Sequence, residues 1–240
     1  MNRKPGLIAT AAIATVTTMN NPLLRLLHLV SPTLPTGAFS YSQGLEWAVE
    51  NGWIYDSKSL TSWLLDLAEH SMVYVDIPIL SRMYIAIKKD DSKELEFLCN
   101  TLLACRESSE LQEEEQTRGR ALTTLLGKLN LLKESIPTAT LKKSQLAGYV
   151  LAAIQWDINL QDAALGYIWA WVENQVITGI KIIPLGQTQG QQLLMKINSE
   201  IPSIVDLGLQ IKDQEIGASS PALALACSMH ETQYTRLYRS

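Results

Sequence analysis

Apolar residues recur at three- and four-residue spacing along most of the chain, and this spacing is typical of amphipathic helices. The first clear case is the segment 22–30, whose apolar side chains fall on one helical face: Leu23, Leu26, Leu27 and Val30. The best candidate for a strand, Val176–Ile183, continues a helical pattern that starts at Leu160. The sequence shows no hairpin signal and no repeat with a period of about 20–50 residues. We therefore predict an all-α fold, a single compact domain of about nine or ten helices over residues 22–230.

Polar residues that cap helix N-termini divide this pattern into its elements. Asn21 before Pro22 combines a capping side chain with a proline at the first helical position. Ser40 and Gln43 have the spacing of a capping box, and the helix that they predict ends at Asn51–Gly52. The other predicted N-caps are Asp56, Asp76, Asp91, Ser109, Asn159 and Ser220. Each of these positions predicts the start of a helix.

Residues 1–21 form a separate N-terminal extension. Arg3 and Lys4 precede a short apolar run, residues 6–16, and this arrangement weakly resembles a secretory signal. The run is rich in Ala and Thr rather than Leu, and a second methionine, Met19, stands just before the first predicted helix. We interpret the extension as disordered or as a misassigned start, and a signal sequence stays open as the alternative.

Composition narrows the function classes. With 47% hydrophobic residues and a net charge of −4, the chain is too apolar and too weakly charged for a disordered protein. The slight acidic excess argues against nucleic-acid binding, and no apolar stretch is long enough to span a membrane. Three cysteines without a framework spacing, Cys99, Cys105 and Cys227, favour buried thiols in a reducing compartment. We therefore expect a globular protein of the cytoplasm that binds neither nucleic acid nor membrane.

The motifs that suggest catalysis or metal binding are weak. Cys227 and His230 have a spacing that places both on one helical face, but two ligands do not make a metal site. We interpret them as a buried thiol and a helix-terminal histidine. Three successive glutamates, Glu113–Glu115, point in different directions on a helix, and we interpret them as a solvated face. Neither a nucleophile elbow nor a phosphate-binding loop is found, so we predict no catalytic residue, no cofactor and no resident metal.

Two segments have no evident role in a helical core. Residues 31–46 link two predicted helices and contain more Pro and Gly than a simple connection requires. Residues 230–240 combine aromatic residues, leucine and arginine, although chain ends are usually polar and frayed. Aromatic and arginine side chains are the residue types of interface hot spots. We therefore interpret residues 231–240 as a tail that docks on a partner.

The same two segments resemble a known family. Residues 26–46, LLHLVSPTLPTGAFSYSQGLE, resemble the N-terminal signature of the UreF family of urease accessory proteins. Further segments match the family in order at residues 104–111, 119–122, 183–191 and 230–240, so that the resemblance extends from about residue 22 to residue 240. The residues that characterise the signature are Pro35, Gly37, Ser40, Tyr41, Gly44 and Glu46.

The resemblance implies an all-helical, homodimeric protein with no catalytic activity of its own. It implies an adaptor that bridges a UreD/UreH-type accessory protein and the UreG GTPase, so that nickel is delivered to apo-urease. Two alternatives stay open. One is a GTPase-activating regulator of UreG that supplies an arginine finger, for which Arg82, Arg106 or Arg120 could serve. The other is a chaperone that binds nickel directly through Cys227 and His230.

Three regions are expected to serve these partners. We expect the tail to be disordered alone and to order on the UreD-type partner, through Tyr234, Arg236, Leu237, Tyr238, Arg239 and Ser240. The resemblance points to a second region that faces the GTPase, made of Lys181, Pro184, Leu185, Gly186, Gln187 and Gln191. Residues 35–44 are expected to fix the geometry of the first helices, near the partner surface or a nickel route.

Overall fold

A computed structural model of the chain describes residues 21–218 and 220–239. The interpretation of residues 1–20, and the partner contact expected of Ser240, therefore lie outside the described residues. The elements in chain order are α1 (Pro22–Leu29), η1 (Ala38–Ser40), α2 (Leu45–Glu50), α3 (Ser57–Leu67), η2 (Ala68–Asp76), α4 (Ile77–Lys88), α5 (Ser92–Ala104), α6 (Ser109–Lys128), α7 (Thr138–Leu141), α8 (Gln145–Gln155), α9 (Leu160–Ile182), α10 (Gln187–Asn198), α11 (Ile201–Gln210), η3 (Asp213–Glu215) and α12 (Pro221–His230).

The predicted all-α fold is confirmed for the described part of the chain, which contains no strand. Residues 57–88 run on without a break through α3, the π-helix η2 and α4. With that run counted as one helix, and without the single turn α7, the described residues form ten helices, nine of them of seven residues or more. The strand candidate Val176–Ile183 lies almost wholly within α9. No helix in these residues is both long and apolar enough to cross a bilayer.

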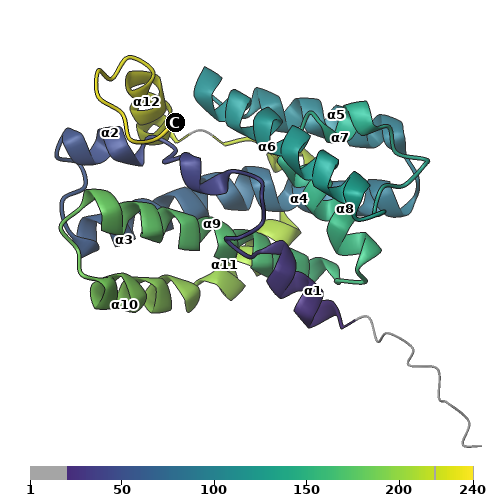
Figure 1. Ribbon diagram of the computed structural model, residues 1–240, viewed down its shortest axis with the longest axis horizontal. Coiled ribbons are helices and arrows are strands. Elements are labelled where there is room, and N and C mark those ends of the chain that lie inside the picture. The colour runs from purple at the N-terminus through teal and green to yellow at the C-terminus, as the bar shows by residue number, and fades with distance from the viewer. Residues whose placement is uncertain (1–20, 219, 240) are drawn as a thin grey trace, which may run out of the picture.

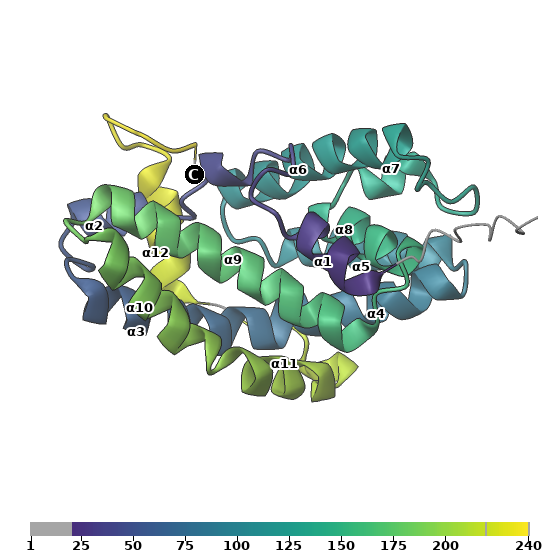
Figure 2. The same ribbon diagram turned by 60° about the horizontal axis from the view of Figure 1, so that its bottom comes forward.

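Two largely buried helices, α4 and α8, form the centre of the molecule. In α8 every residue from Gln145 to Ala153 is buried, as expected of a helix that is covered all round, whereas α4 leaves Ile85 and Lys88 exposed on one side. The helices α5, α6, α9 and α11 pack against this pair, and α1 lies across α8 and α9 (Figure 1). At the other end of the molecule, α2 packs against α12 and α9, and Figure 2 shows these helices together beside the C-terminus.

Several predicted helix starts are confirmed. The side chain of Asn21 accepts a hydrogen bond from the Leu23 amide at 3.0 Å, and Asp56 forms a reciprocal capping box with Ser59. Asp91 and Asn159 cap α5 and α9 by accepting the backbone amides three residues on. The start at Ser220 is also correct, although its side chain makes no capping hydrogen bond.

Three predicted N-caps are wrong, because the side chain bonds another group or the helix starts at a different residue. Ser40 ends the short turn η1, and α2 begins five residues later at Leu45, with Gly44 as its N-cap. Asp76 lies inside the continuous helical run 57–88, and its carboxylate pairs with Arg106 instead of capping a helix. The cap of α6 is Ser108, whose hydroxyl accepts the Leu111 amide, rather than its neighbour Ser109.

The crossing of α6 over the start of α8 supplies a stability prediction. A Cβ on Gly119 would lie 2.9 Å from the backbone carbon of Ser144, and backbone cannot move aside as a flexible side chain can. Gly119→Ala should therefore lower the free energy of unfolding by about 2–3 kcal/mol through overpacking. Gly127→Ala is the matched control in the same helix, because its Cβ would meet only a Leu132 methyl at 3.4 Å. That control should leave stability unchanged or raise it by up to about 1 kcal/mol. Urea denaturation measures the free energy of unfolding of both variants. Equal changes in the two would contradict the close packing of α6 on α8 at Gly119.

Candidate partner-binding site

The signature segment, residues 31–46, crosses α6 and α9 in a conformation set by three residues with positive φ. Gly37 and Gly44 have φ of 76° and 75°, and between them Gln43 has φ of 53°. A Cβ on Gly44 would lie 2.9 Å from the backbone nitrogen of Cys227, so this glycine also permits α12 to pack closely. The glycines of the signature are therefore required by backbone geometry.

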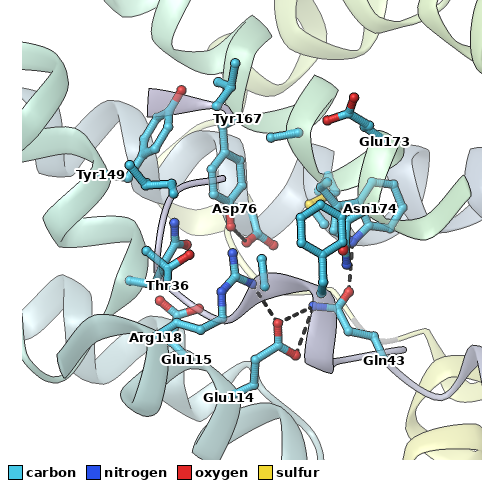
Figure 3. Close-up of a pocket in the computed structure, with 18 of the residues that line it drawn as sticks. Thr36, Gln43, Asp76, Glu114, Glu115, Arg118, Tyr149, Tyr167, Glu173 and Asn174 are labelled. Carbon is cyan, nitrogen blue, oxygen red and sulfur yellow. Dashed lines mark hydrogen bonds and ion pairs between the residues drawn. The ribbon is translucent and has the colours of Figure 1, made fainter. Parts of the chain in front are cut away.

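Gln43 is held in its unusual conformation by partners from two helices. Its Nε2 donates to Glu114 of α6 at 3.1 Å, and its Oε1 accepts from the indole Nε1 of Trp171 in α9 at 2.8 Å. Figure 3 shows Gln43 and Arg118 converging on the Glu114 carboxylate, and Arg118 donates to it at 2.7 Å. These hydrogen bonds fix the side chain of Gln43 between α6 and α9.

A second buried charge cluster lies behind the segment. Arg106 donates two hydrogen bonds to Asp76, at 2.6 and 3.1 Å, and a third to Glu115 at 3.3 Å. Glu115 also accepts from the Ser144 hydroxyl and the Leu146 amide. Burial alone would lower the pKa of Arg106, but the two facing carboxylates outweigh it and raise that pKa well above its ordinary value. The guanidinium therefore stays charged.

These residues correct the interpretation of Glu113–Glu115 as a solvated face. Glu113 is exposed, but Glu114 and Glu115 are buried because each faces an arginine from the same helix or from the turn before it. They line a cavity of about 110 Å³ together with Asp76, Arg118 and residues of the signature segment (Figure 3). Each carboxylate of the cluster accepts from an arginine, and this arrangement indicates a structural role rather than acid–base chemistry.

The C-terminal tail lies on the signature segment. The Glu46 carboxylate accepts the backbone amide of Leu237 at 2.7 Å and that of Tyr238 at 3.0 Å. The Arg239 amide donates to the Ser40 carbonyl at 2.8 Å. Arg236 forms an ion pair of 2.6 Å with Glu110 of α6. The tail that we expected to be disordered alone is thus folded back on the protein's own surface, and the two segments that sequence reasoning singled out are in contact.

His230, the last residue of α12, lies beneath this contact. Its Nδ1 is 2.8 Å from Glu110 Oε2, and its Nε2 is 3.3 Å from Glu46 Oε2. Cys227 is buried on the same helix, and burial raises the pKa of its thiol, which opposes the thiolate form that binds metals. Within the described residues, no group of three or more His, Cys, Asp or Glu side chains is placed to hold a metal ion. The imidazole is instead engaged by two carboxylates.

Of the anchor residues predicted in the tail, some are exposed and one is buried. Tyr238 is only 9% exposed, whereas Leu237 is 76% exposed and Tyr234 fully exposed. On α12, Leu225 and Met229 are also exposed and stand one helical turn apart. Sequence reasoning missed this pair because nearly every residue of 221–230 is apolar or small, so that no polar face marks the outside. Together, Leu225, Met229, Tyr234 and Leu237 are named the tail surface.

The second predicted region lies at the α9–α10 turn. Lys181, Pro184, Gly186, Gln187 and Gln191 are exposed, and Leu185 is half-buried. Gln187 and Gln191 fall on one face of α10, and the exposed Met195 continues that face by one more turn. These exposed residues, from Lys181 to Met195, are named the turn surface.

The two surfaces lie at the same end of the molecule. Lys181 follows Thr178 by one turn of α9, and the Thr178 side chain lies near the hydroxyl of Tyr238 in the tail. In Figures 1 and 2, the end of α9 lies beside α2, α12 and the C-terminus. One end of the molecule therefore carries both regions that sequence reasoning assigned to partners.

The three arginines considered as arginine fingers differ in solvent exposure and in their partners. Arg106 is enclosed by Asp76 and Glu115. Arg82 pairs with Asp213 at 2.9 Å and donates to the Ile211 carbonyl. Arg120 is exposed on α6, where its guanidinium donates to the Thr117 hydroxyl. Arg120 is therefore the candidate of these three whose side chain faces solvent.

Comparison with known proteins agrees with the family resemblance of the chain. The UreF family pattern matches residues 54–198. A urease accessory protein UreF of Alcanivorax borkumensis is 44% identical over 227 residues, which cover 92% of this chain and 99% of that protein. Proteins of the same name from Pseudomonas putida and Alkalilimnicola ehrlichii are 45% and 44% identical, over 91% and 94% of this chain and 97% and 100% of their own lengths. The chain belongs to the UreF family of urease accessory proteins.

Proposed function

We propose that this chain is a non-catalytic adaptor of urease maturation, which bridges a UreD/UreH-type accessory protein and the UreG GTPase so that nickel reaches apo-urease. Its site of action is the cytoplasm. The observation that carries the proposal is the tail surface, in which the chain end holds apolar side chains outward on a hydrogen-bonded support. Family membership supplies the link to urease maturation.

The tail surface is the contact for the UreD-type partner. Large exposed apolar side chains are concentrated between residues 225 and 237, on α12 and the tail, and exposed apolar patches on a globular protein mark interaction sites. Tyrosine contributes a large rigid contact area, and tyrosine and arginine are enriched among interface hot spots. The exposed Arg239 at the edge of this surface suits a carboxylate on the partner.

The turn surface is the contact for the GTPase. It combines one lysine with amide side chains and the exposed Met195, and a polar rim of this kind is typical of interfaces that form and dissociate. Because Lys181 is a single turn from the residue that contacts Tyr238, both partners would meet at one end of the adaptor. Such a placement supports a bridge between them.

Lys181→Ala should weaken recruitment of the GTPase about tenfold, because it removes a charge from the edge of the proposed contact. Binding of the UreD-type partner should stay unchanged. Lys196→Ala is the matched control, since Lys196 is an exposed lysine of α10 outside the predicted region. Co-purification from a mixture of the three proteins measures both. An unchanged GTPase recruitment by the Lys181 variant would count against the assignment of the turn surface.

An exposed apolar face on α1 supports a homodimer. Leu23, Leu24 and Leu27 are more than half exposed on this short helix, while Leu29 faces the core. Homodimer interfaces are more apolar than the rest of a protein surface. Light scattering of the purified chain measures its mass in solution, and a monomer at micromolar concentration would contradict the homodimer.

The alternative of a GTPase-activating regulator rests on the exposed Arg120. An arginine finger would raise GTP hydrolysis by about 10³–10⁵-fold, whereas an adaptor without one leaves turnover within severalfold of the basal rate. GTP turnover of the GTPase with this chain, and with its Arg120→Ala variant, distinguishes the two.

A further inference from the structure

In the contact between Glu46 and the tail, one carboxylate holds two successive backbone amides. Oε1 of Glu46 accepts from Leu237 N, and Oε2 accepts from Tyr238 N. Glu46 is itself buried at the start of α2, so water competes little for these bonds. Hydrogen bonds from N–H groups to a charged acceptor are about twice as strong as those between neutral groups.

The Glu46 carboxylate belongs to a cluster of polar side chains. The imidazole of His230 lies between two acidic side chains, with Nε2 3.3 Å from Glu46 and Nδ1 2.8 Å from Glu110. Arg236 pairs with the other oxygen of Glu110. In addition, Glu231 accepts from the Ser109 amide and hydroxyl, and this fixes the end of α12 to the start of α6. Two carboxyl groups, one imidazole and one guanidinium thus join α2, α6, α12 and the tail.

This arrangement determines which side chains of the tail face outward. With both amides bound to Glu46, Tyr238 is inserted toward α9, where Thr178 meets its hydroxyl. The neighbouring Leu237 points into solvent at 76% exposure. A tail released from Glu46 would sample many conformations, and a partner would have to order it on binding, which lowers affinity.

We propose that Glu46 is a positioning residue, which, backed by His230, holds the tail in the conformation that presents Tyr234 and Leu237 to the UreD-type partner. The inference rests on the proposed function, because it assumes that the tail surface binds that partner. Glu46 itself contacts the tail from beneath and does not touch the partner. Its effect on binding is therefore exerted through the order of the tail.

The first test compares Glu46→Gln with Glu113→Gln in the full-length chain. The amide of glutamine offers one acceptor oxygen and places an NH₂ against the second backbone donor. Glu113 is an exposed glutamate of α6 and serves as the control. We expect hydrogen exchange at the Leu237 and Tyr238 amides to be at least tenfold faster in Glu46→Gln and unchanged in Glu113→Gln. Affinity for the UreD-type partner should fall about tenfold in the first variant only.

A second pair of variants avoids the buried carboxylate, and so keeps the test valid if Glu46→Gln folds poorly. Leu237→Pro and Leu237→Ala both remove the exposed leucine side chain, but only proline removes the amide that Glu46 Oε1 binds. The proline variant should exchange its Tyr238 amide faster and bind the partner several times more weakly than the alanine variant. Equal behaviour of the two would overturn the inference.

The outcomes separate this inference from the proposed function. If a chain lacking residues 234–240 binds the UreD-type partner normally, the proposed role of the tail surface is wrong. If that truncation abolishes binding while Glu46→Gln speeds amide exchange without lowering affinity, the tail surface stands and the positioning role of Glu46 is overturned. Unchanged exchange of both amides in Glu46→Gln overturns it as well.

Discussion

A chain that ends at Gln233 should bind the UreD-type partner at least 100-fold more weakly than the full-length chain. The truncation removes Tyr234 and Leu237, the most exposed large side chains of the tail surface. Hot-spot residues contribute about 2 kcal/mol or more each, and about 2.7 kcal/mol corresponds to a factor of 100 in affinity. Calorimetry or surface-binding measurements with the purified partner give the two dissociation constants.

The double variant Tyr234→Ala/Leu237→Ala is the control for this truncation. It keeps the backbone amides that Glu46 binds, so it separates loss of the side chains from loss of the folded-back tail. Most of the loss in affinity should be reproduced by the double variant. A truncated chain that co-purifies with the partner as the full-length chain does would contradict the assignment of the tail.

Arg106→Ala should lower the free energy of unfolding by about 3–5 kcal/mol, the largest stability effect that we expect from a single substitution. The arginine is 14% exposed, and its removal leaves Asp76 fully buried and Glu115 nearly so, without the cation that both face. A domain of ordinary stability, about 5–15 kcal/mol, would lose a third or more of its margin. Urea denaturation followed by circular dichroism measures the change.

Lys143→Ala provides the contrast for that experiment. Lys143 pairs with Glu96 at 2.6 Å, but the two side chains are 37% and 51% exposed, and surface ion pairs contribute about 0–1 kcal/mol. An Arg106 variant that is no less stable than the Lys143 variant would contradict the structural role of the buried cluster. It would also remove the reason for excluding Arg106 as an arginine finger.

Helical periodicity and local capping predicted the fold, because both are read from residues close together in sequence. Asp56 and Asn159 cap their helices as expected, since the amides that they accept lie three residues away. Ser40 and Asp76 have sequence patterns that predict an N-cap equally well, but neither caps a helix. Residues far along the chain interact with them instead. The carboxylate of Asp76 is taken by Arg106, and nothing in the sequence around Asp76 indicates that partner.

The sequence predicted the two segments that form the candidate site, but not that they lie in contact. The Pro- and Gly-rich signature and the aromatic tail both stood out by composition. Their contact joins Glu46 to Leu237, which are 191 positions apart, and no periodicity relates residues at that distance. The burial of Glu114 and Glu115 was missed for the same reason. A run of glutamates is typical of a solvated helix face, and the residues that contact these two, Gln43 and Ser144, are distant in sequence.

Bridging of the two partners is the central claim, and a three-protein binding experiment tests it most directly. The UreG GTPase is immobilised, and the UreD-type protein is applied with and without this chain, in the presence of nickel and a GTP analogue. We expect the UreD-type protein to be retained only when the full-length chain is present, and to be lost with the chain that ends at Gln233. Retention of the UreD-type protein to the same extent without this chain would contradict the adaptor function.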